Sequence, residues 1–354
     1  MNEATEFYKN LYKDESKTYE NNASPCCEEF SQPKVPSILK SEVREQLRLL
    51  KKEKATDMEG IRNEQLKRGG EPLVGYLCAL FNKILIEKRI PEQWKLAKII
   101  LIPKKGNLKS ISNYRPISII PAIYKIFAKI IQKRIQKTLE NFQTRDQAGF
   151  RKGFATVDHI LVIRQLIEKA KEFGFDLYFG LIDYKKAFDM VKHNFMIDTL
   201  RIAGVEEEYV QLIQEIYNGA ASRVSLETLG PIFPLQRGLK QGDPLSPDLF
   251  NAVIQRVFDT RKFTGEGISI LGQNLTNLKF ADDVILIERT AKLLEKAISA
   301  VAEESGLAGL EINIDKTFIV TNGKKENIEL FGKPLKYADD TIYLGQVITF
   351  GVSN

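Results

Sequence analysis

Two adjacent acids, Asp282 and Asp283, stand between apolar stretches that each have the composition of a β-strand. This pattern predicts a hairpin whose tight turn presents both carboxylates at one end of a sheet. Because adjacent like charges repel, the arrangement favours a bound divalent cation and indicates metal-assisted phosphoryl chemistry. Taken alone, an Asp-Asp pair is more often a solvated turn. The same tripeptide at Ala338-Asp339-Asp340 lacks a preceding apolar stretch and predicts an ordinary turn.

A third acid, Asp183, ends the apolar stretch 177–182, which predicts another strand. If this strand lies beside the hairpin of Asp282 and Asp283, three carboxylates meet at one end of the sheet. Two Mg²⁺ ions held there would activate a hydroxyl nucleophile and stabilise a departing pyrophosphate, the two-metal scheme for in-line displacement. Such chemistry depends mainly on positioning and charge, so it requires little acid–base machinery from the protein.

The elements that would position these acids alternate irregularly between helices and strands. Helical periodicity covers much of residues 37–88, and residues 98–102 predict a buried strand. A long helix opens at Pro121 and carries a basic stripe. The stripe consists of Lys125, Lys129, Lys133 and Lys137. This order of elements predicts the α+β class, with helices packed on one face of a mainly antiparallel sheet.

The composition, 43% apolar and 28% charged over 354 residues, is that of an ordinary globular protein. No apolar run reaches the roughly 18 residues of a membrane span, and the N-terminus lacks a signal-peptide pattern. The three cysteines show no metal-ligand spacing, and only two histidines exist, which disfavours a zinc site or a His-based triad. We therefore expect an intracellular protein, nuclear or cytoplasmic, that is not secreted and has no membrane partner.

Positive charge is concentrated in one part of the chain. Between Lys83 and Lys137, fourteen Lys and Arg residues stand against two acids, Glu87 and Glu92. A segment of this kind is typical of contact with a phosphate backbone, and a merely solvated basic face is the alternative.

Seven segments in a fixed order carry a family resemblance over roughly residues 45–350. They are Asn113-Tyr114-Arg115-Pro116-Ile117-Ser118, Gln147-Ala148-Gly149-Phe150-Arg151-Lys152-Gly153, Asp183 with Phe188-Asp189, Gly238-Leu239-Lys240-Gln241-Gly242-Asp243-Pro244-Leu245-Ser246-Pro247, Phe280-Ala281-Asp282-Asp283, Gly309-Leu310-Glu311-Ile312-Asn313 with Lys316-Thr317, and Tyr343-Leu344-Gly345. In this series the chain resembles the reverse transcriptases of non-LTR (LINE-type) retrotransposons. The ending Tyr-Leu-Gly-Gln is most similar to the RTE-like branch.

The resemblance implies a right-hand polymerase with fingers and palm, whose palm is a ferredoxin-like antiparallel sheet, and a thumb that is lacking or truncated. The expected organisation is a polar, partly disordered lead-in over residues 1–36 and fingers with the basic helix over 37–175. The palm would cover 176–336, and a primer-grip hairpin with a truncated end would cover 337–354.

The resemblance also implies site residues. Asp183, Asp282 and Asp283 would be the catalytic, metal-binding triad for two Mg²⁺ ions, with Mn²⁺ as a substitute, and Asp283 would be the least certain ligand. The nucleotide-binding set would be Arg115, Lys104, Phe188, Gln241, Gly242 and Lys316, and Arg151 could assist. Tyr343, Leu344 and Gly345 would form the primer grip.

Each of these assignments has a structural alternative. Arg115 could make a structural salt bridge, Gly242 could serve only a turn, and Lys316 could be a solvated lysine. Tyr343 could be packed in the core instead of stacking on a base. Phe188 stands five residues after Asp183, where the family's aromatic collides with a ribose 2′-hydroxyl, and this implies selection of dNTPs.

The predicted function is therefore an RNA-directed DNA polymerase, a nucleotidyltransferase acting on an RNA template, a DNA primer and dNTPs. Met190 and Lys192 depart from the family pattern. The alternative function is a truncated, inactive remnant that only binds nucleic acid through its basic fingers. An RNA-templated RNA polymerase is disfavoured by Phe188. The sequence leaves the oligomeric state open.

Overall fold

The computed structural model describes residues 2–14, 34–104, 107–258 and 266–351. The chain divides into two compact units. The first joins Met1–Glu140 to Phe188–Leu249, and the second joins Asn141–Ala187 to Phe250–Asn354. In the described residues, no helix is both long and apolar enough to cross a membrane. The boundaries expected for the fingers, the palm and the primer grip are not tested by this division and stay a prediction.

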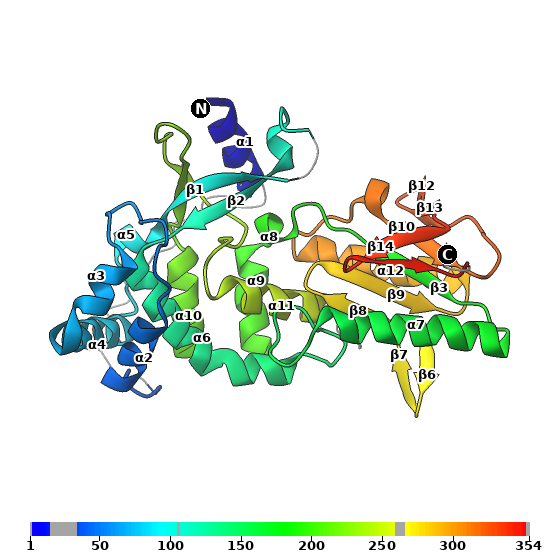
Figure 1. Ribbon diagram of the computed structural model, residues 1–354, viewed down its shortest axis with the longest axis horizontal. Helices are drawn as coiled ribbons and strands as arrows, with labels where there is room; N and C mark the ends of the chain where they lie inside the picture. The colour runs from blue at the N-terminus through cyan, green and yellow to red at the C-terminus, as the bar shows by residue number, and fades with distance from the viewer. Residues whose placement is uncertain (1, 15–33, 105–106, 259–265, 352–354) are drawn as a thin grey trace. The chain divides into compact units, whose positions relative to one another are not determined.

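The first unit contains a four-stranded sheet and most of the helices (Figure 1). The strand order is β2 (Tyr114–Ile119), β1 (Leu96–Pro103), β4 (Ala221–Val224), β5 (Phe233–Pro234), with only β1 and β4 parallel. The helices are α1 (Asn2–Leu11), α2 (Lys40–Leu49), α3 (Asn63–Arg68), α4 (Gly70–Glu87), α5 (Glu92–Lys95), α6 (Ala122–Phe142), α8 (Ala187–Met190), α9 (His193–Ile202) and α10 (Glu207–Tyr217). Helix α11 (Ser246–Val257) and helices α6 and α8 run across the division.

Helix α1 lies inside the segment expected to be a lead-in. Ala4, Tyr8 and Tyr12 are buried in a cluster with Ile99, Phe233 and neighbouring apolar side chains. Residues 15–33 lie outside the described residues, so the expected disorder there stays a prediction.

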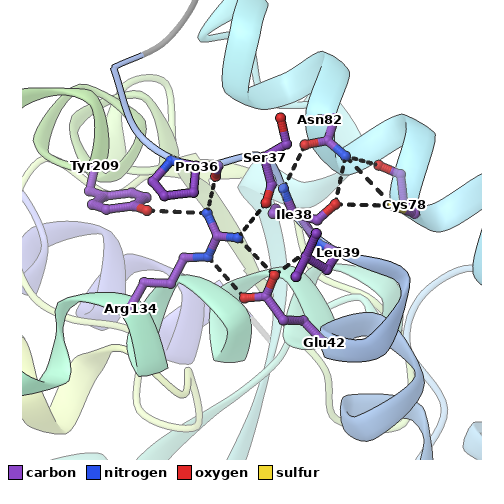
Figure 2. Close-up of polar contacts among 9 residues, drawn as sticks. All are labelled: Pro36, Ser37, Ile38, Leu39, Glu42, Cys78, Asn82, Arg134 and Tyr209. Carbon is purple, nitrogen blue, oxygen red and sulfur yellow. Dashed lines mark hydrogen bonds and ion pairs between the residues drawn. The ribbon is translucent and has the colours of Figure 1, made fainter.

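The basic helix predicted after Pro121 is confirmed as α6, but part of its charge is neutralised inside the unit. Lys133 forms an ion pair with Glu45 at 2.7 Å. Figure 2 shows Arg134 between Glu42 and the extended backbone before α2. Its guanidinium donates twice to Glu42, at 2.9 and 2.7 Å, and also to the carbonyls of Pro36 and Ser37. Because the donors of Arg134 are used in this way, its role is structural.

The same extended segment is held from its other side by helix α4 (Figure 2). The amide of Asn82 accepts from the backbone N–H of Ile38 at 2.7 Å and donates to its carbonyl at 2.9 Å. The Sγ of Cys78 donates to the same carbonyl. These bonds satisfy backbone groups that precede α2 and would otherwise be unpaired.

The second unit is built on a five-stranded sheet. The strand order is β13 (Lys336–Tyr337), β10 (Phe318–Thr321), β3 (Tyr178–Ile182), β9 (Asp283–Glu288), β8 (Asn277–Phe280), and only β10 and β13 are parallel. Its long helices are α7 (Thr156–Phe173) and α12 (Ala291–Leu307). Three hairpins complete it: β6 (Ile268–Ile270) with β7 (Gln273–Leu275), β11 (Glu329–Leu330) with β12 (Lys333–Pro334), and β14 (Asp340–Tyr343) with β15 (Gln346–Thr349). Two short 3-10 helices are η1 (Ile111–Asn113), in the first unit, and η2 (Ile314–Lys316).

The predicted α+β class with a mainly antiparallel sheet is confirmed, but one detail differs. Helices cover both faces of the five-stranded sheet and not one. Phe179 and Leu181 of β3 pack with α7, whereas a side chain at Gly180 would meet Leu294 of α12 at 2.9 Å. The reason is visible in the strand itself, since every residue of β3 is buried and a continuous apolar strand needs cover on both sides.

Candidate active site

The sheet of the second unit brings two of the three predicted carboxylates side by side. Strands β3 and β9 are antiparallel neighbours, with Ile182 opposite Val284, so the next pair in this register is Asp183 with Asp283. Asp282 lies in the two-residue turn between β8 and β9, where Phe280 pairs with Asp283. The other turn residue, Ala281, has φ +58°. The predicted hairpin is confirmed, and the condition on which the three carboxylates would meet, that β3 lies beside this hairpin, is fulfilled.

The carboxylates are close enough to interact electrostatically. Burial, together with the negative charges of Asp282 and Asp183, raises the pKa of Asp283 to about 6. In the described part of the chain, no three His, Cys, Asp or Glu side chains form a ready-made metal-binding group. The acids fit a divalent cation in two respects, because oxygen is the ligand that Mg²⁺ prefers and because a cation would relieve their mutual repulsion.

The segment 309–317 holds Asp183 in place. The side-chain amide of Asn313 donates to Oδ2 of Asp183 at 3.0 Å, and the backbone N–H of Asn313 donates to its carbonyl at 2.7 Å. Lys316 lies three residues further on, exposed, in η2. No role was predicted for Asn313, and its position in the family segment Gly309–Asn313 is the only sequence signal for this contact.

The turn that carries Asp282 is supported by segment 147–149. Oε1 of Gln147, a fully buried residue, accepts from the backbone N–H of Ala281 at 3.1 Å and from that of Gly149 at 2.8 Å. Gly149 is packed so closely that a Cβ there would lie 2.3 Å from the nitrogen of Ala281. Both residues belong to the family segment Gln147–Gly153, but nothing in the sequence indicates their contact with the turn.

In the first unit, the structure brings Arg115 and Lys104 to one hairpin. Arg115 of β2 pairs with Ile102 of β1, and the backbone N–H of Lys104 donates to the carbonyl of Asn113 at 2.9 Å. Both side chains are exposed. Among the described residues Arg115 has no ion-pair or hydrogen-bond partner, so the structural salt bridge considered for it is not found there.

The loop of Gln241 and Gly242 packs against the same hairpin. The backbone N–H of Ser118 donates to the carbonyl of Gln241 at 2.7 Å. Gly242 has φ +112°, and a Cβ there would lie 2.8 Å from the carbonyl oxygen of Ser118. Gly242 is therefore required both by its backbone conformation and by the close approach of β2.

Phe188 is half-buried in α8, and its carbonyl accepts from the backbone N–H of Leu239 at 2.7 Å. The next residue, Asp189, is buried and accepts from Nε2 of Gln241 at 2.9 Å. Arg151, suggested as an assisting residue, belongs to the second unit and donates to the carbonyls of Thr144 and Gln147.

The hairpin of Tyr343, Leu344 and Gly345 has the expected turn, with φ of +48° at Leu344 and +81° at Gly345. Tyr343 itself is buried in the core beside α7, and its hydroxyl lies 3.2 Å from Nδ1 of His159. Of the two alternatives for Tyr343, the structure therefore supports core packing and not base stacking. In the second Asp-Asp pair, where an ordinary turn was predicted, both residues are exposed: Asp339 lies in a bend and pairs with Lys325, and Asp340 begins strand β14.

Comparisons with known proteins agree on the family. The family model described as "Reverse transcriptase (RNA-dependent DNA polymerase)" matches residues 102–348. The retrovirus-related Pol polyprotein from the type-2 retrotransposable element R2DM of Drosophila melanogaster is 30% identical over 248 residues, 70% of this chain and 23% of that protein. The corresponding R2 polyprotein of Popillia japonica is 30% identical over 67% of this chain and 34% of its own length. The chain thus spans about a quarter to a third of the length of these relatives.

Apo telomerase from Candida tropicalis has a similar fold, with a TM-score of 0.54 and 15% identity. The likeness covers 79% of this chain and 52% of that one. At this level of identity the comparison concerns the fold alone, and it confirms the right-hand architecture with fingers and palm that the sequence predicted.

Proposed function

Since the chain belongs to the reverse transcriptase family, and within it to the enzymes of non-LTR (LINE-type) retrotransposons, we propose that it is an RNA-directed DNA polymerase. The reaction is the addition of dNTPs to the 3′-hydroxyl of a DNA primer along an RNA template. The RTE-like branch stays a prediction. Residues 37–175 are assigned to the fingers, 176–336 to the palm and 337–354 to the primer-grip hairpin as part of the same proposal.

One observation carries the proposal. Asp183 and Asp283 are register neighbours on paired strands, Asp282 lies in the adjoining turn, and their charges together with burial raise the pKa of Asp283 to about 6. Repulsion between these carboxylates lowers the stability of the fold, and a bound cation would relieve it. Such an arrangement is typical of a functional site. A solvated turn, the alternative for an Asp-Asp pair, is what the exposed pair at 339–340 represents.

Reverse transcriptases use divalent metal ions, and Asp183, Asp282 and Asp283 are the residues that would hold them here. Two Mg²⁺ ions, when bound, supply activation of the primer hydroxyl and charge stabilisation of the leaving pyrophosphate. Asn313 restrains the carboxylate of Asp183, and Gln147 restrains the backbone of the turn that carries Asp282, so the protein itself would hold these positions for the ions. Lys316, exposed in η2, would contribute positive charge toward the pyrophosphate.

In the first unit, Arg115 and Lys104 would bind the triphosphate, because their exposed cationic groups share one hairpin. Gly242 would allow the backbone to approach the nucleotide, with Gln241 beside it. Phe188 would exclude a ribose 2′-hydroxyl.

The test is primer extension on an RNA template with Mg²⁺ and either dNTPs or NTPs. The wild type is expected to extend the primer with dNTPs and not with NTPs. Asp282→Asn should abolish extension while template binding persists. Asp198→Asn, at an exposed acid of α9 outside the assigned site, is the control and should keep wild-type activity. Undiminished extension by Asp282→Asn would refute its role. Salt-sensitive template binding by the wild type without any synthesis would identify the inactive remnant instead.

A further inference from the structure

Asp189 joins the N-terminal helix to the Gln241 loop inside the first unit. Asp189 is 2% exposed, and one of its carboxylate oxygens, Oδ1, accepts from the hydroxyl of Tyr12 at 3.0 Å and from Nε2 of Gln241 at 2.9 Å. We propose that Tyr12 is a positioning residue for nucleotide binding, acting through Asp189 on Gln241. The inference rests on the proposed function, because it assigns Tyr12 to the same nucleotide-binding loop.

The bond to Asp189 sets the direction in which the amide of Gln241 faces. An ionised carboxylate only accepts hydrogen bonds, so the NH₂ end of Gln241 must face Asp189. The carbonyl end of the same amide is then left as an acceptor for a ligand. The hydroxyl of Tyr12 fixes Asp189 by a charge-assisted bond in a buried setting, where such a bond is stronger than in water.

The C-terminal end of α1 and the residue after it, Tyr12, also form hydrogen bonds with the segment 236–238, which precedes Gln241. The backbone N–H of Gln236 donates to the carbonyl of Tyr12 at 3.0 Å, and Nε of Arg237 donates to the carbonyl of Leu11 at 2.9 Å. At Gly238, with φ +89°, a Cβ would lie 2.6 Å from the carbonyl oxygen of Asp189 and 3.0 Å from the ring of Tyr12. Segment 236–238 is thus enclosed by Tyr12 on one side and Asp189 on another.

The same network includes the backbone of the proposed sugar-excluding residue. The backbone N–H of Leu239 donates to the carbonyl of Phe188, and that of Gly238 donates to the carbonyl of Val191 at 2.8 Å. A displacement of Asp189 would therefore shift both Phe188 and Gln241. The ring of Tyr12 stacks on Phe233, with centroids 6.4 Å apart, and this contact restrains the position of the hydroxyl.

The experiment compares Tyr12→Phe with Tyr209→Phe in the full chain. The first variant removes one hydroxyl and keeps the ring, and the second removes a hydroxyl of the same unit that bonds Arg134 instead. Tyr12→Phe should lower kcat/KM for dNTP about tenfold, mainly through KM, as loss of a charge-assisted bond implies. Tyr209→Phe should leave KM unchanged. In a Gln241→Ala background, Tyr12→Phe should have no further effect on KM.

Three kinetic results would overturn the inference: an unchanged KM for Tyr12→Phe, an equal rise in KM for Tyr209→Phe, or a full additional loss in the Gln241→Ala background. Amide hydrogen exchange distinguishes a failure of this inference from a failure of the proposed function. Even if the wild type fails to synthesise DNA, which defeats the proposed function, Tyr12→Phe should speed exchange at Ser118, whose N–H bonds Gln241, relative to Tyr209→Phe. Equal protection at Ser118 in the two variants would overturn the inference alone.

Discussion

Gly149→Ala tests whether the Asp282 turn must stay where segment 147–149 holds it. The added Cβ would lie 2.3 Å from the nitrogen of Ala281 and 2.8 Å from the carbonyl carbon of Phe280, and both contacts are to backbone. An ordinary contact begins near 3.4 Å, so the turn must retreat by about 1 Å. Because a misplacement of about 1 Å at a catalytic group costs on the order of 100-fold, kcat should fall by about that factor. Overpacking should also lower the free energy of unfolding by about 1–3 kcal/mol.

The assay is steady-state primer extension, together with thermal unfolding of the same preparations. Gly306→Ala is the control, because Gly306 of α12 has open space around it and its φ lies outside the left-handed region. This control should keep wild-type kcat and gain up to about 1 kcal/mol of stability, since Ala favours a helix over Gly. A folded Gly149→Ala protein with wild-type kcat would refute the reasoning that backbone contact at Gly149 positions Asp282.

Two further predictions concern other groups. Burial lowers the pKa of Lys240 to about 8 from an ordinary 10.5, so between these pH values the unfolded chain binds a proton that the folded chain does not. Stability should therefore rise with pH across this window, by at most about 3 kcal/mol, and Lys240→Met should remove that rise in urea unfolding at pH 7.5 to 10. If the free energy of unfolding rose with pH equally steeply in Lys240→Met, the lowered pKa of Lys240 would be contradicted. Phe188→Ala should admit NTPs in primer extension, and an unchanged preference for dNTPs would count against the proposed exclusion.

The sequence alone was sufficient to predict strands β3, β8 and β9 and the acids that stand at their ends. Strand β3 is continuously apolar and is followed directly by Asp183, while Asp282 and Asp283 come after β8, in which Leu278 and Phe280 alternate with polar residues. Local pattern therefore fixes which residues reach the end of the sheet. That the two strands are neighbours was a conditional statement, and the pairing of Ile182 with Val284 confirms it. The cover on both faces of the sheet was missed, although the continuous apolar character of β3 is its signal.

The supporting residues could not be found in this way, because their contacts join distant parts of the chain. Gln147 bonds Ala281 across 134 positions, and Asn313 bonds Asp183 across 130. Tyr12 meets Asp189 across 177 positions. Nothing in the local composition of these segments indicates such partners, since hydrogen bonds between side chains depend on the tertiary packing.

Charge patterning was informative about the segment but not about individual residues. The basic stretch from Lys83 to Lys137 includes Arg134, which is saturated by Glu42 and backbone carbonyls, and Lys95, a buried residue paired with Glu215 at 2.7 Å. It also includes Arg115, exposed and without a partner among the described residues. Whether a cation is available to a phosphate therefore depends on acids that come near only in the folded chain.

The most direct test of the account is the stoichiometry of Mn²⁺ binding, measured by electron paramagnetic resonance with an RNA template, a DNA primer and a non-hydrolysable dNTP analogue present. Two tightly bound ions are expected in the wild type and in Asp198→Asn, and loss of tight binding is expected in Asp183→Asn and in Asp282→Asn. Two ions bound with wild-type affinity after substitution of Asp183 would contradict the claim that the carboxylates at the end of β3 and β9 hold the catalytic metals.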